Sequence, residues 1–340
     1  MKRLVWLGGN EFRFEQRDGS VPAPPPGQVT VRVKAVGVCG TDIHIISGNY
    51  GLAKPPLVLG HEMAGVIAAA GSGVTRVQAG DRVTVDQVVG CGECFFCRRG
   101  SVQFCETGFE LGITRDGGCQ DFVVTPERNV YRIPDSISFE EAAILDMEVW
   151  AALDKCSIQP GDSVLVLGHG PAGMVACQIA KAMGAGKVIL AGRSEARLTK
   201  AATLGLADIY VRVQQQDLLE AVKSVTGGRG ADVVFECAGA AETAAAAIEA
   251  AICGGRVVFY GVQAAPLERF DINRLVLKDL VVFGALSDRR GWEQVIALVV
   301  TGKLRLAPLI THRFPLDCAP QAYELVRNKA GGVVKAVLTL

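Results

Sequence analysis

Residues 163–173 read Ser163-Val164-Leu165-Val166-Leu167-Gly168-His169-Gly170-Pro171-Ala172-Gly173. A continuous apolar run of this kind is typical of a strand buried on both faces of a parallel sheet. The run leads into G-x-G-x-x-G and then into helical spacing, which together form the fingerprint of a dinucleotide site. Gly168 allows the tight turn, Gly170 lets the backbone approach a pyrophosphate, and Gly173 lets the helix pack closely. We therefore predict that this turn, with Pro171 and Ala172 at the positive end of the helix, holds a dinucleotide.

Strands and helices alternate after this turn, as a doubly wound α/β sheet requires. Helical spacing covers residues 171–183, 194–204, 217–226 and 243–251. Strand-like runs cover residues 187–191, 209–211, 231–235 and 256–260. We predict a parallel-sheet Rossmann domain over residues 148–286. We interpret His169 as a filler of the loop without a catalytic role.

The second strand of this domain bears on the choice of cofactor. An NAD site places an acidic residue at the end of this strand, where its carboxylate binds the ribose hydroxyls. Here Gly192, Arg193 and Ser194 follow the strand instead, and they offer a 2′-phosphate room, a positive charge and a hydroxyl. We therefore expect NADP to be preferred over NAD, unless Arg193 is only a solvated loop residue. Further expected cofactor contacts are Arg197 and the residues after two later strands, Cys237, Ala238, Gly261 and Val262.

The first part of the chain is rich in short β-like runs that Gly and Pro interrupt. Such runs lie at residues 29–36, 63–69 and 82–85, and they predict an irregular, mostly antiparallel β domain. Helical spacing follows at residues 139–156, 291–301 and 319–328, and a last strand-like run covers residues 333–338. We expect this tail strand to complete the first domain. The predicted division is therefore 1–147 with 287–340, and 148–286.

Four of the 11 cysteines are clustered in the first part of the chain. They have the spacing C-x2-C-x2-C-x7-C, at Cys91, Cys94, Cys97 and Cys105. Four thiolates so close in sequence can surround one tetrahedral Zn²⁺, and no position is then left open for a substrate. We therefore predict a structural zinc in a lobe at residues 88–106. An iron–sulfur cluster uses the same ligands, but nothing else in the sequence indicates electron transfer.

The bulk composition argues against several classes of protein. The chain has 340 residues, a formal net charge of zero and 49% hydrophobic residues. These values suit two globular domains and give no reason to expect binding to nucleic acid or to an anionic membrane. No uncharged apolar run approaches the length of about 20 residues that spans a bilayer, and the N-terminus resembles a strand and not a signal peptide. We expect a cytoplasmic protein without nucleic-acid or membrane partners.

Two short segments carry the expected chemistry. The first is Gly37-Val38-Cys39-Gly40-Thr41-Asp42-Ile43-His44, and the second is Gly60-His61-Glu62-Met63-Ala64-Gly65. Together with the cysteine lobe and the dinucleotide turn, they give the chain a resemblance over its whole length to the zinc-containing medium-chain alcohol dehydrogenases. Residues 111–118, Leu111-Gly112-Ile113-Thr114-Arg115-Asp116-Gly117-Gly118, and residues 332–335 also fit that family. Within the family, the chain most resembles the polyol (sorbitol) and threonine dehydrogenase branch.

The resemblance implies a GroES-like catalytic domain that holds a catalytic zinc. The implied ligands are Cys39, His61, the adjacent Glu62, directly or through water, and an acidic residue that falls at Asp146. The family acid is commonly followed by Pro, which is absent here, so Glu148 is an alternative ligand. Mixed ligands with an exchangeable position are typical of catalytic zinc.

The resemblance also implies a mechanism. Zinc polarises the substrate hydroxyl, and a hydride passes from the carbinol carbon to C4 of the nicotinamide. The proton leaves through the hydroxyl of Thr41 and the nicotinamide ribose to His44, which passes it to solvent. The alternative is that Thr41 and His44 only pack in a turn.

The sequence leaves the substrate open among secondary alcohols and their ketones. Candidates for the substrate cleft are Asn49, Tyr50, Lys54, Trp150 and Arg290. They would suit a polyol, a cyclitol or an aminocyclitol, while threonine and butanediol remain alternatives. Two rival classes are a zinc-free reductase, against which the retained ligands argue, and a non-enzymatic cofactor sensor on the same fold. We expect a homo-oligomer, either a dimer or a tetramer, with two zinc ions per chain.

Overall fold

The computed structural model describes residues 1–145, 147–262, 270–286 and 290–340. The chain forms two compact units, the first from residues 1–145 and 306–340 and the second from residues 146–305. The second boundary lies at Leu306 and not at the expected residue 287. The reason is that α10 (Trp292–Val300) packs on α4 (Met147–Lys155) and so belongs to the second unit.

Antiparallel pairing dominates the first unit. Its main sheet has the strand order β10-β6-β5-β3-β18-β17, with β9 also paired to β3, and smaller sheets have the orders β2-β1-β4 and β7-β8. The strands are β1 (Lys2–Gly8), β2 (Glu11–Gln16), β3 (Gln28–Val38), β4 (Leu57–Val58), β5 (Glu62–Ala70), β6 (Arg82–Val85), β7 (Val88–Val89), β8 (Phe109–Glu110), β9 (Phe122–Pro126), β10 (Val130–Arg132), β17 (Ile310–Pro315) and β18 (Lys335–Thr339). The helices are α1 (Gly40–Ile46), α2 (Phe95–Arg98), α3 (Phe139–Ala143) and α11 (Ala319–Arg327).

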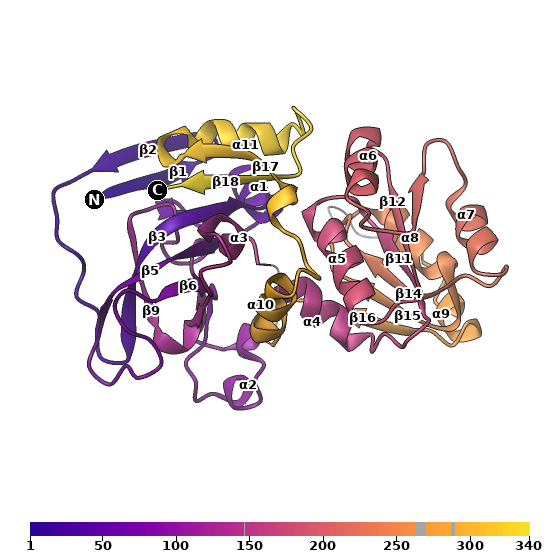
Figure 1. Ribbon diagram of the computed structural model, residues 1–340, viewed down its shortest axis with the longest axis horizontal. Coiled ribbons are helices and arrows are strands. Elements are labelled where there is room, and N and C mark those ends of the chain that lie inside the picture. Colours follow the sequence, from indigo (N-terminus) through magenta and orange to yellow (C-terminus); the bar gives the residue numbers. More distant parts are fainter. Residues whose placement is uncertain (146, 263–269, 287–289) are drawn as a thin grey trace. The chain divides into compact units, whose positions relative to one another are not determined.

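Strand β3 is the centre of this unit because it pairs with three other strands. Its run of valines is almost wholly buried, and β-branched side chains of this kind pack well on a pleated surface. The tail strand β18 pairs antiparallel with β3, with Ala336 opposite Val38. Figure 1 shows the yellow C-terminal strand beside the indigo β3. The end of the chain therefore completes the sheet that its beginning starts.

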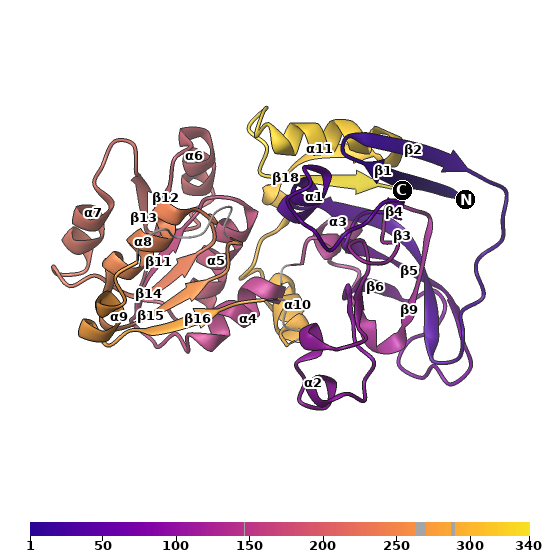
Figure 2. The same ribbon diagram turned by 180° about the vertical axis from the view of Figure 1, so that it is seen from behind.

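The second unit is a six-stranded parallel sheet with the order β13-β12-β11-β14-β15-β16. The strands are β11 (Ser163–Leu167), β12 (Lys187–Gly192), β13 (Ile209–Arg212), β14 (Ala231–Glu236), β15 (Ala251–Phe259) and β16 (Val281–Gly284). The other helices are α5 (Pro171–Ala182), α6 (Glu195–Thr203), α7 (Leu218–Val225), α8 (Ala241–Ala250) and α9 (Asn273–Leu277). In Figures 1 and 2, α4 and α5 cover one face of the sheet while α7, α8 and α9 gather on the other. The predicted doubly wound α/β fold is thus confirmed.

The single helix predicted at residues 139–156 is wrong, because the structure has two helices there. Helix α3 ends at Ala143, and Ile144 leaves the helical region with φ −106° and ψ 19°. Helix α3 packs on β3, β5 and β6 of the first unit, whereas α4 packs on α5 of the second. The apolar residues of 139–156 have one continuous helical spacing, but those of α3 pack in the first unit and those of α4 pack in the second.

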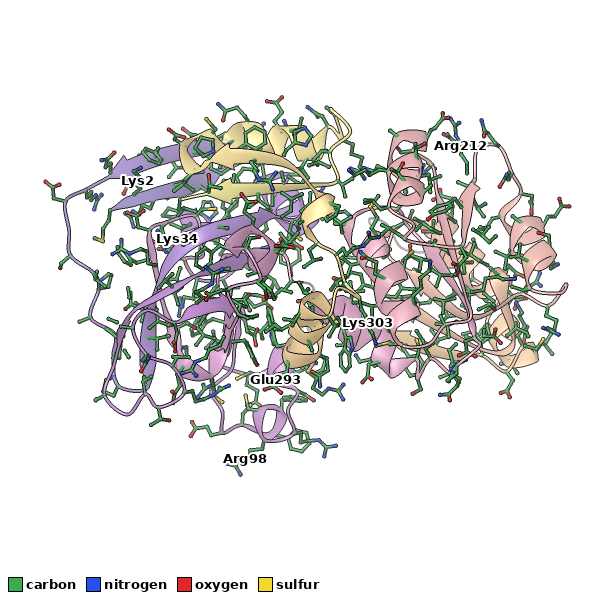
Figure 3. The ribbon with its side chains drawn as sticks, viewed as in Figure 1. Lys2, Lys34, Arg98, Arg212, Glu293 and Lys303 are labelled. Atoms are coloured by element: carbon green, nitrogen blue, oxygen red, sulfur yellow. The ribbon has the colours of Figure 1, made fainter. Side chains whose placement is uncertain are left out.

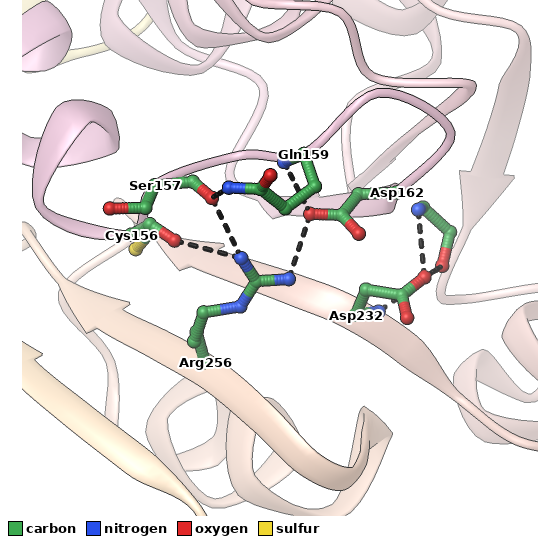
Figure 4. A network of polar contacts seen from close by, with 7 residues as sticks. Cys156, Ser157, Gln159, Asp162, Asp232 and Arg256 are labelled. Carbon is green, nitrogen blue, oxygen red and sulfur yellow. Dashed lines mark hydrogen bonds and ion pairs between the residues drawn. The ribbon is translucent and has the colours of Figure 1, made fainter.

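A polar network fastens the segment that leads into β11 (Figure 4). The guanidinium of Arg256 donates to the carbonyl oxygens of Cys156 and Ser157, each at 2.9 Å, and to Asp162 Oδ2 at 2.7 Å. Asp232 accepts both the N–H and the hydroxyl of Ser163. These bonds satisfy backbone groups before the parallel strands begin, so they hold β11 against β14 and β15.

No helix within the described ranges combines the length and the apolar character that crossing a bilayer demands.

Candidate functional site

Cys39, His61 and Glu62 converge in the first unit, where one candidate ligand atom from each lies within 4.8 Å of the others. Cys39 follows β3 and caps α1, while Glu62 begins β5. The antiparallel pairing of β3 with β5 puts Gly37 opposite Glu62. A Cβ atom at Gly37 would lie 2.0 Å from Glu62 Oε2. A glycine at this position therefore leaves the space that the carboxylate occupies.

A buried carboxylate, Asp42, joins two of these three residues. Its Oδ2 atom accepts the backbone N–H of Cys39 at 2.9 Å, and its Oδ1 atom lies 3.4 Å from Nδ1 of His61. A carboxylate behind a histidine orients the ring and leaves the other nitrogen for a metal ion. No role was expected for Asp42 from the sequence, although its place between Thr41 and His44 is a signal that it belongs to the site.

The donor set of a thiol, an imidazole and a carboxylate suits Zn²⁺. Burial disfavours the protonated form of His61, but the negative charges of Asp42 and Cys39 outweigh that cost and raise its pKa well above the usual value. The pocket therefore favours positive charge. Glu62 also binds Lys335 of β18, whose Nζ lies 2.7 Å from Oε1 and 2.6 Å from Oε2. Lys335 lies in residues 332–335, which fit the family in sequence, but this contact with Glu62 was not expected from the sequence.

The expected relay residues lie on the helix that follows Cys39. Thr41 Oγ1 is 3.7 Å from Cys39 Sγ. His44 lies three residues further along α1 and is exposed to solvent. A hydroxyl beside the candidate metal ligands and an exposed imidazole on the same short helix suit the two ends of a proton path.

Of the two acidic residues expected to complete the catalytic site, Asp146 and Glu148, only Glu148 is among the described residues. Asp146 lies outside the described residues. Its alternative, Glu148, is on α4 of the second unit, and its Oε2 atom lies 3.5 Å from the hydroxyl of Tyr260.

The substrate-cleft candidates are divided between the two units. Asn49 and Lys54 are exposed and Tyr50 is half-buried in the first unit. Trp150 is half-buried and Arg290 is exposed in the second.

The four cysteines of the lobe also converge, with all four sulfur atoms within 4.8 Å of one another. The Sγ atoms of Cys91 and Cys97 are 3.9 Å apart, and those of Cys94 and Cys105 are 3.8 Å apart. Backbone N–H groups of Glu93 and Cys94 donate to Cys91 Sγ and lower the pKa of that thiol to about 6. Arg98 extends from the end of α2 at the edge of the lobe (Figure 3). Four close sulfurs with N–H donors around them fit a closed tetrahedral metal site.

The dinucleotide turn has the geometry that its glycines predict. Gly168 has φ +125°, where a side chain would be strained. A Cβ at Gly173 would lie 1.8 Å from the carbonyl oxygen of Gly168, so the helix and strand approach closely there. A Cβ at Gly170 would meet nothing within 4 Å, which leaves open space for a ligand. Pro171 is the first residue of α5, and Ala172 follows it in the first turn.

The end of β12 gathers cationic and hydroxyl groups. Ser194 caps α6 by accepting the N–H of Arg197 at 3.5 Å, and its own N–H donates to Nε2 of His169 at 2.9 Å. His169 is therefore more than a filler, because it ties the dinucleotide turn to this strand end. Arg193 is exposed beside them. Arg212, labelled in Figure 3, was not among the expected contacts. It ends β13 next to Gly192 and pairs with Glu195 at 2.7 Å.

The loop after β14 is held by a buried carboxylate. Glu236 Oε1 accepts the N–H groups of Ala238 and Gly239 at 2.8 and 3.0 Å, and the hydroxyl of Thr243 at 2.7 Å. Cys237 contacts the dinucleotide turn, with its Sγ 3.6 Å from the carbonyl oxygen of Gly168. Strand β14, which this loop follows, lies between β11 and β15 in the sheet (Figure 1).

The residues that follow β15 complete this edge of the second unit. Gly261 donates its N–H to the carbonyl oxygen of Glu236 at 3.1 Å. Val262 is 70% exposed. Both expected contacts therefore lie at the carboxyl ends of the strands, where ligands of open α/β sheets bind.

Comparisons with known proteins agree with this arrangement. Residues 25–135 match the family model described as alcohol dehydrogenase GroES-like domain, and residues 171–301 match the one described as zinc-binding dehydrogenase. The chain is 34% identical to sorbitol dehydrogenase of Halalkalibacterium halodurans, with 100% of this chain and 99% of the relative covered. It is 37% identical to L-threonine 3-dehydrogenase of Pyrococcus abyssi, with 92% of each chain covered.

Solved structures lead to the same family. A putative zinc-binding dehydrogenase from Sinorhizobium meliloti 1021, bound to NADP, is 31% identical with a TM-score of 0.91, and covers 100% of this chain and 99% of its own. An alcohol dehydrogenase from E. coli CFT073, complexed with NADH, is 32% identical with a TM-score of 0.90 and the same coverage. The chain therefore belongs to the zinc-containing medium-chain alcohol dehydrogenase family, whose members join zinc and a nicotinamide cofactor in the oxidation of alcohols.

Proposed function

We propose that the chain interconverts a hydroxyl-rich secondary alcohol and its ketone, with NADP as cofactor, at a zinc site formed by Cys39, His61 and Glu62. The convergence of these three side chains carries the proposal. Asp146 is the proposed fourth ligand. A second, structural zinc in the four-cysteine lobe brings the proposed total to two per chain.

The protein contributes positioning and a path for the proton. When bound, zinc acts as a Lewis acid and the nicotinamide accepts the hydride. Asp42 holds His61 and the backbone of Cys39, so the ligands need not reorganise during the reaction. The Thr41 hydroxyl accepts a hydrogen bond from the substrate hydroxyl. As it takes up the substrate proton, it releases its own proton toward His44. His44, exposed on α1, exchanges that proton with solvent.

The substrate class is proposed from resemblance and from polar groups. The similarity to a sorbitol dehydrogenase favours a polyol, cyclitol or aminocyclitol. Asn49, Tyr50, Lys54, Trp150 and Arg290 are the proposed substrate-binding residues. The similarity to threonine dehydrogenases keeps threonine as the second candidate, and butanediol follows it.

A substrate panel tests this proposal directly. The purified, zinc-loaded protein is mixed with NADP⁺ and with sugar alcohols, cyclitols, aminocyclitols, threonine or 2,3-butanediol, and absorbance of the reduced nicotinamide is followed. We expect the highest kcat/KM with a hydroxyl-rich ring or chain and loss of turnover on chelation. Nucleotide binding without turnover of any panel member would favour a cofactor sensor.

The cofactor preference has its own support in the second unit. Gly192, Arg193, Ser194 and Arg197 are the proposed contacts of the 2′-phosphate, and Arg212 lies in register with Gly192. The other proposed contacts are the dinucleotide turn and Cys237, Ala238, Gly261 and Val262. Comparison of kcat/KM for NADP⁺ and NAD⁺ with one substrate tests the choice, and a clear preference for NAD⁺ would contradict it.

We also propose that the protein is a homo-oligomer. Strand β16 is an edge strand of the parallel sheet, and its Val281 and Val282 are 48% and 39% exposed. An apolar edge strand offers unpaired backbone groups to another chain, and a second copy offers the same edge. Light scattering coupled to gel filtration distinguishes a monomer, a dimer and a tetramer.

The proposed location is the cytoplasm, where a reducing environment preserves thiolate ligands.

A further inference from the structure

One sequence motif has no part in the proposed chemistry, namely residues 111–118, here called the glycine loop. It follows directly on β8 and contains Gly112, Gly117 and Gly118. Two of its side chains, Leu111 and Ile113, are buried in the core of the first unit. These two side chains therefore anchor the loop in the core of the first unit. Its glycines pack against one other backbone segment.

That neighbour is the segment that ends at the metal ligand His61. The N–H of Gly117 donates to the carbonyl oxygen of Val58 at 2.8 Å, and the N–H of Gly118 donates to that of Gly60 at 2.7 Å. In the reverse direction, Asp116 Oδ1 accepts the N–H of Val58 at 3.0 Å. The glycine loop thus holds the backbone immediately before His61.

The packing of the two backbones leaves no room for side chains. A Cβ at Gly112 would lie 2.5 Å from the carbonyl carbon of Gly60 and 2.7 Å from the backbone nitrogen of His61. A Cβ at Gly117 would lie 2.4 Å from the carbonyl oxygen of Gly60. Real Cβ atoms do not approach backbone so closely, so any side chain at these positions would displace Gly60 and the ligand after it.

The same loop is tied to the four-cysteine lobe. The N–H of Leu111 donates to the carbonyl oxygen of Gln87 at 3.0 Å, and β8 pairs with β7 just before it. Cys91 lies two residues after β7, and Cys105 lies four residues before β8. A metal ion bound by both cysteines would hold the outer ends of this strand pair together. The inner end of the pair leads into the glycine loop.

We propose that the glycine loop is a positioning element for the zinc ligand His61, and that the four-cysteine lobe fixes the loop in place. The proposal rests on the proposed zinc site at Cys39, His61 and Glu62. Its consequence is that metal in the lobe strengthens metal binding at the catalytic site. The lobe then acts on the chemistry through backbone contacts and not through any group that touches the substrate.

The first test compares Gly112→Ala with Gly73→Ala. Both glycines have φ +81°, but a Cβ at Gly73 would meet nothing within 4 Å. The two variants therefore carry the same backbone strain and differ in contact with Gly60 and His61. The measurement is Zn²⁺ affinity of the catalytic site, by competition with a chelator on protein whose lobe is loaded. We expect affinity to fall at least tenfold in Gly112→Ala and to stay unchanged in Gly73→Ala.

A milder variant serves if Gly112→Ala does not fold. Asp116→Ala removes only the acceptor of the Val58 N–H, and Asp208→Ala is its control, because Asp208 accepts the N–H of Val188 in the second unit. We expect weaker catalytic-site Zn²⁺ binding and faster amide exchange at residues 58–61 in Asp116→Ala alone. Wild-type affinity and exchange in folded Asp116→Ala would overturn the positioning role.

The second test addresses the lobe. In Cys94→Ser the lobe loses a ligand, and we expect at least a fivefold loss of Zn²⁺ affinity at the catalytic site with faster amide exchange at residues 111–118. Should Cys94→Ser fail to fold, Arg128→Met replaces it, because Arg128 binds the carbonyl oxygen of Gly90 beside the lobe. Unchanged affinity in a variant whose lobe is empty or loosened would overturn the coupling.

These outcomes are separate from those of the proposed function. If wild-type protein oxidises an alcohol and the variants bind zinc as it does, only the positioning inference fails. If wild-type protein binds no metal through Cys39 and His61, the proposed function fails and the inference fails with it.

Discussion

The ammonium group of Lys335 lies within 2.7 Å of one oxygen of Glu62 and 2.6 Å of the other. The lysine side chain is 8% exposed and the glutamate side chain 23%. A residue of the last strand thus neutralises a carboxylate that is itself one of the candidate metal ligands.

Replacement of Lys335 by Met makes the stability depend more strongly on zinc. Without the ammonium, the Glu62 carboxylate is left uncompensated in metal-free protein, which we expect to cost about 2–3 kcal/mol because the pair is only partly buried. Bound Zn²⁺ would restore part of this loss. Thermal unfolding should therefore show a larger rise in Tm on zinc addition in Lys335→Met than in wild type. Lys335→Arg, which keeps the charge, is the control, and equal rises in both variants would contradict the idea.

Loss of one catalytic ligand should remove one metal ion and leave the other. In Cys39→Ser we expect zinc per chain to fall from two to one and turnover to be lost, because the lobe retains its own four thiolates. Elemental analysis of the folded variant measures this. Cys253→Ser, which changes an exposed cysteine of the second unit, should keep both ions. Turnover at the normal rate in metal-stripped Cys39→Ser would refute the proposed mechanism.

Asp42→Asn should weaken catalytic metal binding without unfolding the chain. The amide keeps an acceptor for the Cys39 N–H but loses the negative charge that faces His61. Loss of such a supporting group typically costs 10–100-fold in metal affinity or activity, on the order of 1.4–2.7 kcal/mol. Chelator competition provides the measurement. Asp81→Asn is the matched control, because Asp81 also accepts a backbone N–H, from Gln78.

Arg193→Ala tests the proposed 2′-phosphate site. We expect kcat/KM for NADP⁺ to fall about tenfold, which corresponds to about 1.4 kcal/mol, while kcat/KM for NAD⁺ stays the same. Arg229→Ala removes another exposed arginine of the second unit and should change neither value. Equal losses for the two cofactors in Arg193→Ala would show that the arginine does not read the phosphate.

Arg256→Met should destabilise the second unit. It leaves two carbonyl oxygens and Asp162 without their donor, at a cost of about 2 kcal/mol. Since about 1 kcal/mol lowers the Tm of a unit of this size by roughly 2–4 °C, we expect a fall of roughly 4–8 °C. Arg274→Met is the control, because its ion pair with Glu249 is largely exposed and contributes little. Metal content should not change in either variant.

Features with a local signature could be predicted from the sequence. The strand, the glycines and the helix of the dinucleotide turn are adjacent in the chain, so their spacing alone predicts Gly168 at positive φ and Gly173 at a close approach. The four-cysteine lobe is equally local. Its sulfur atoms lie within one short segment and needed no distant partner to be recognised.

Features that depend on distant pairing could not be predicted in the same way. Glu62 and Lys335 are 273 residues apart, and only the pairing of β18 with β3 brings the lysine to the site. Strand β16 was overlooked because a run of four residues, Val281 to Gly284, has too little periodicity to stand out. The boundary at Leu306 depends on the packing of α10 on α4, which the apolar spacing of α10 alone does not indicate.

The insertion of β18 beside β3 has a consequence for synthesis on the ribosome. Residues 146–305 are continuous in the chain and can fold as soon as they emerge. The earlier residues 1–145 remain incomplete, because residues 35–38 of β3, which β9 does not cover, stay unpaired on one side until residues 335–339 have been translated. The nascent polypeptide can therefore complete its nucleotide-binding half before the sheet around β3 is complete.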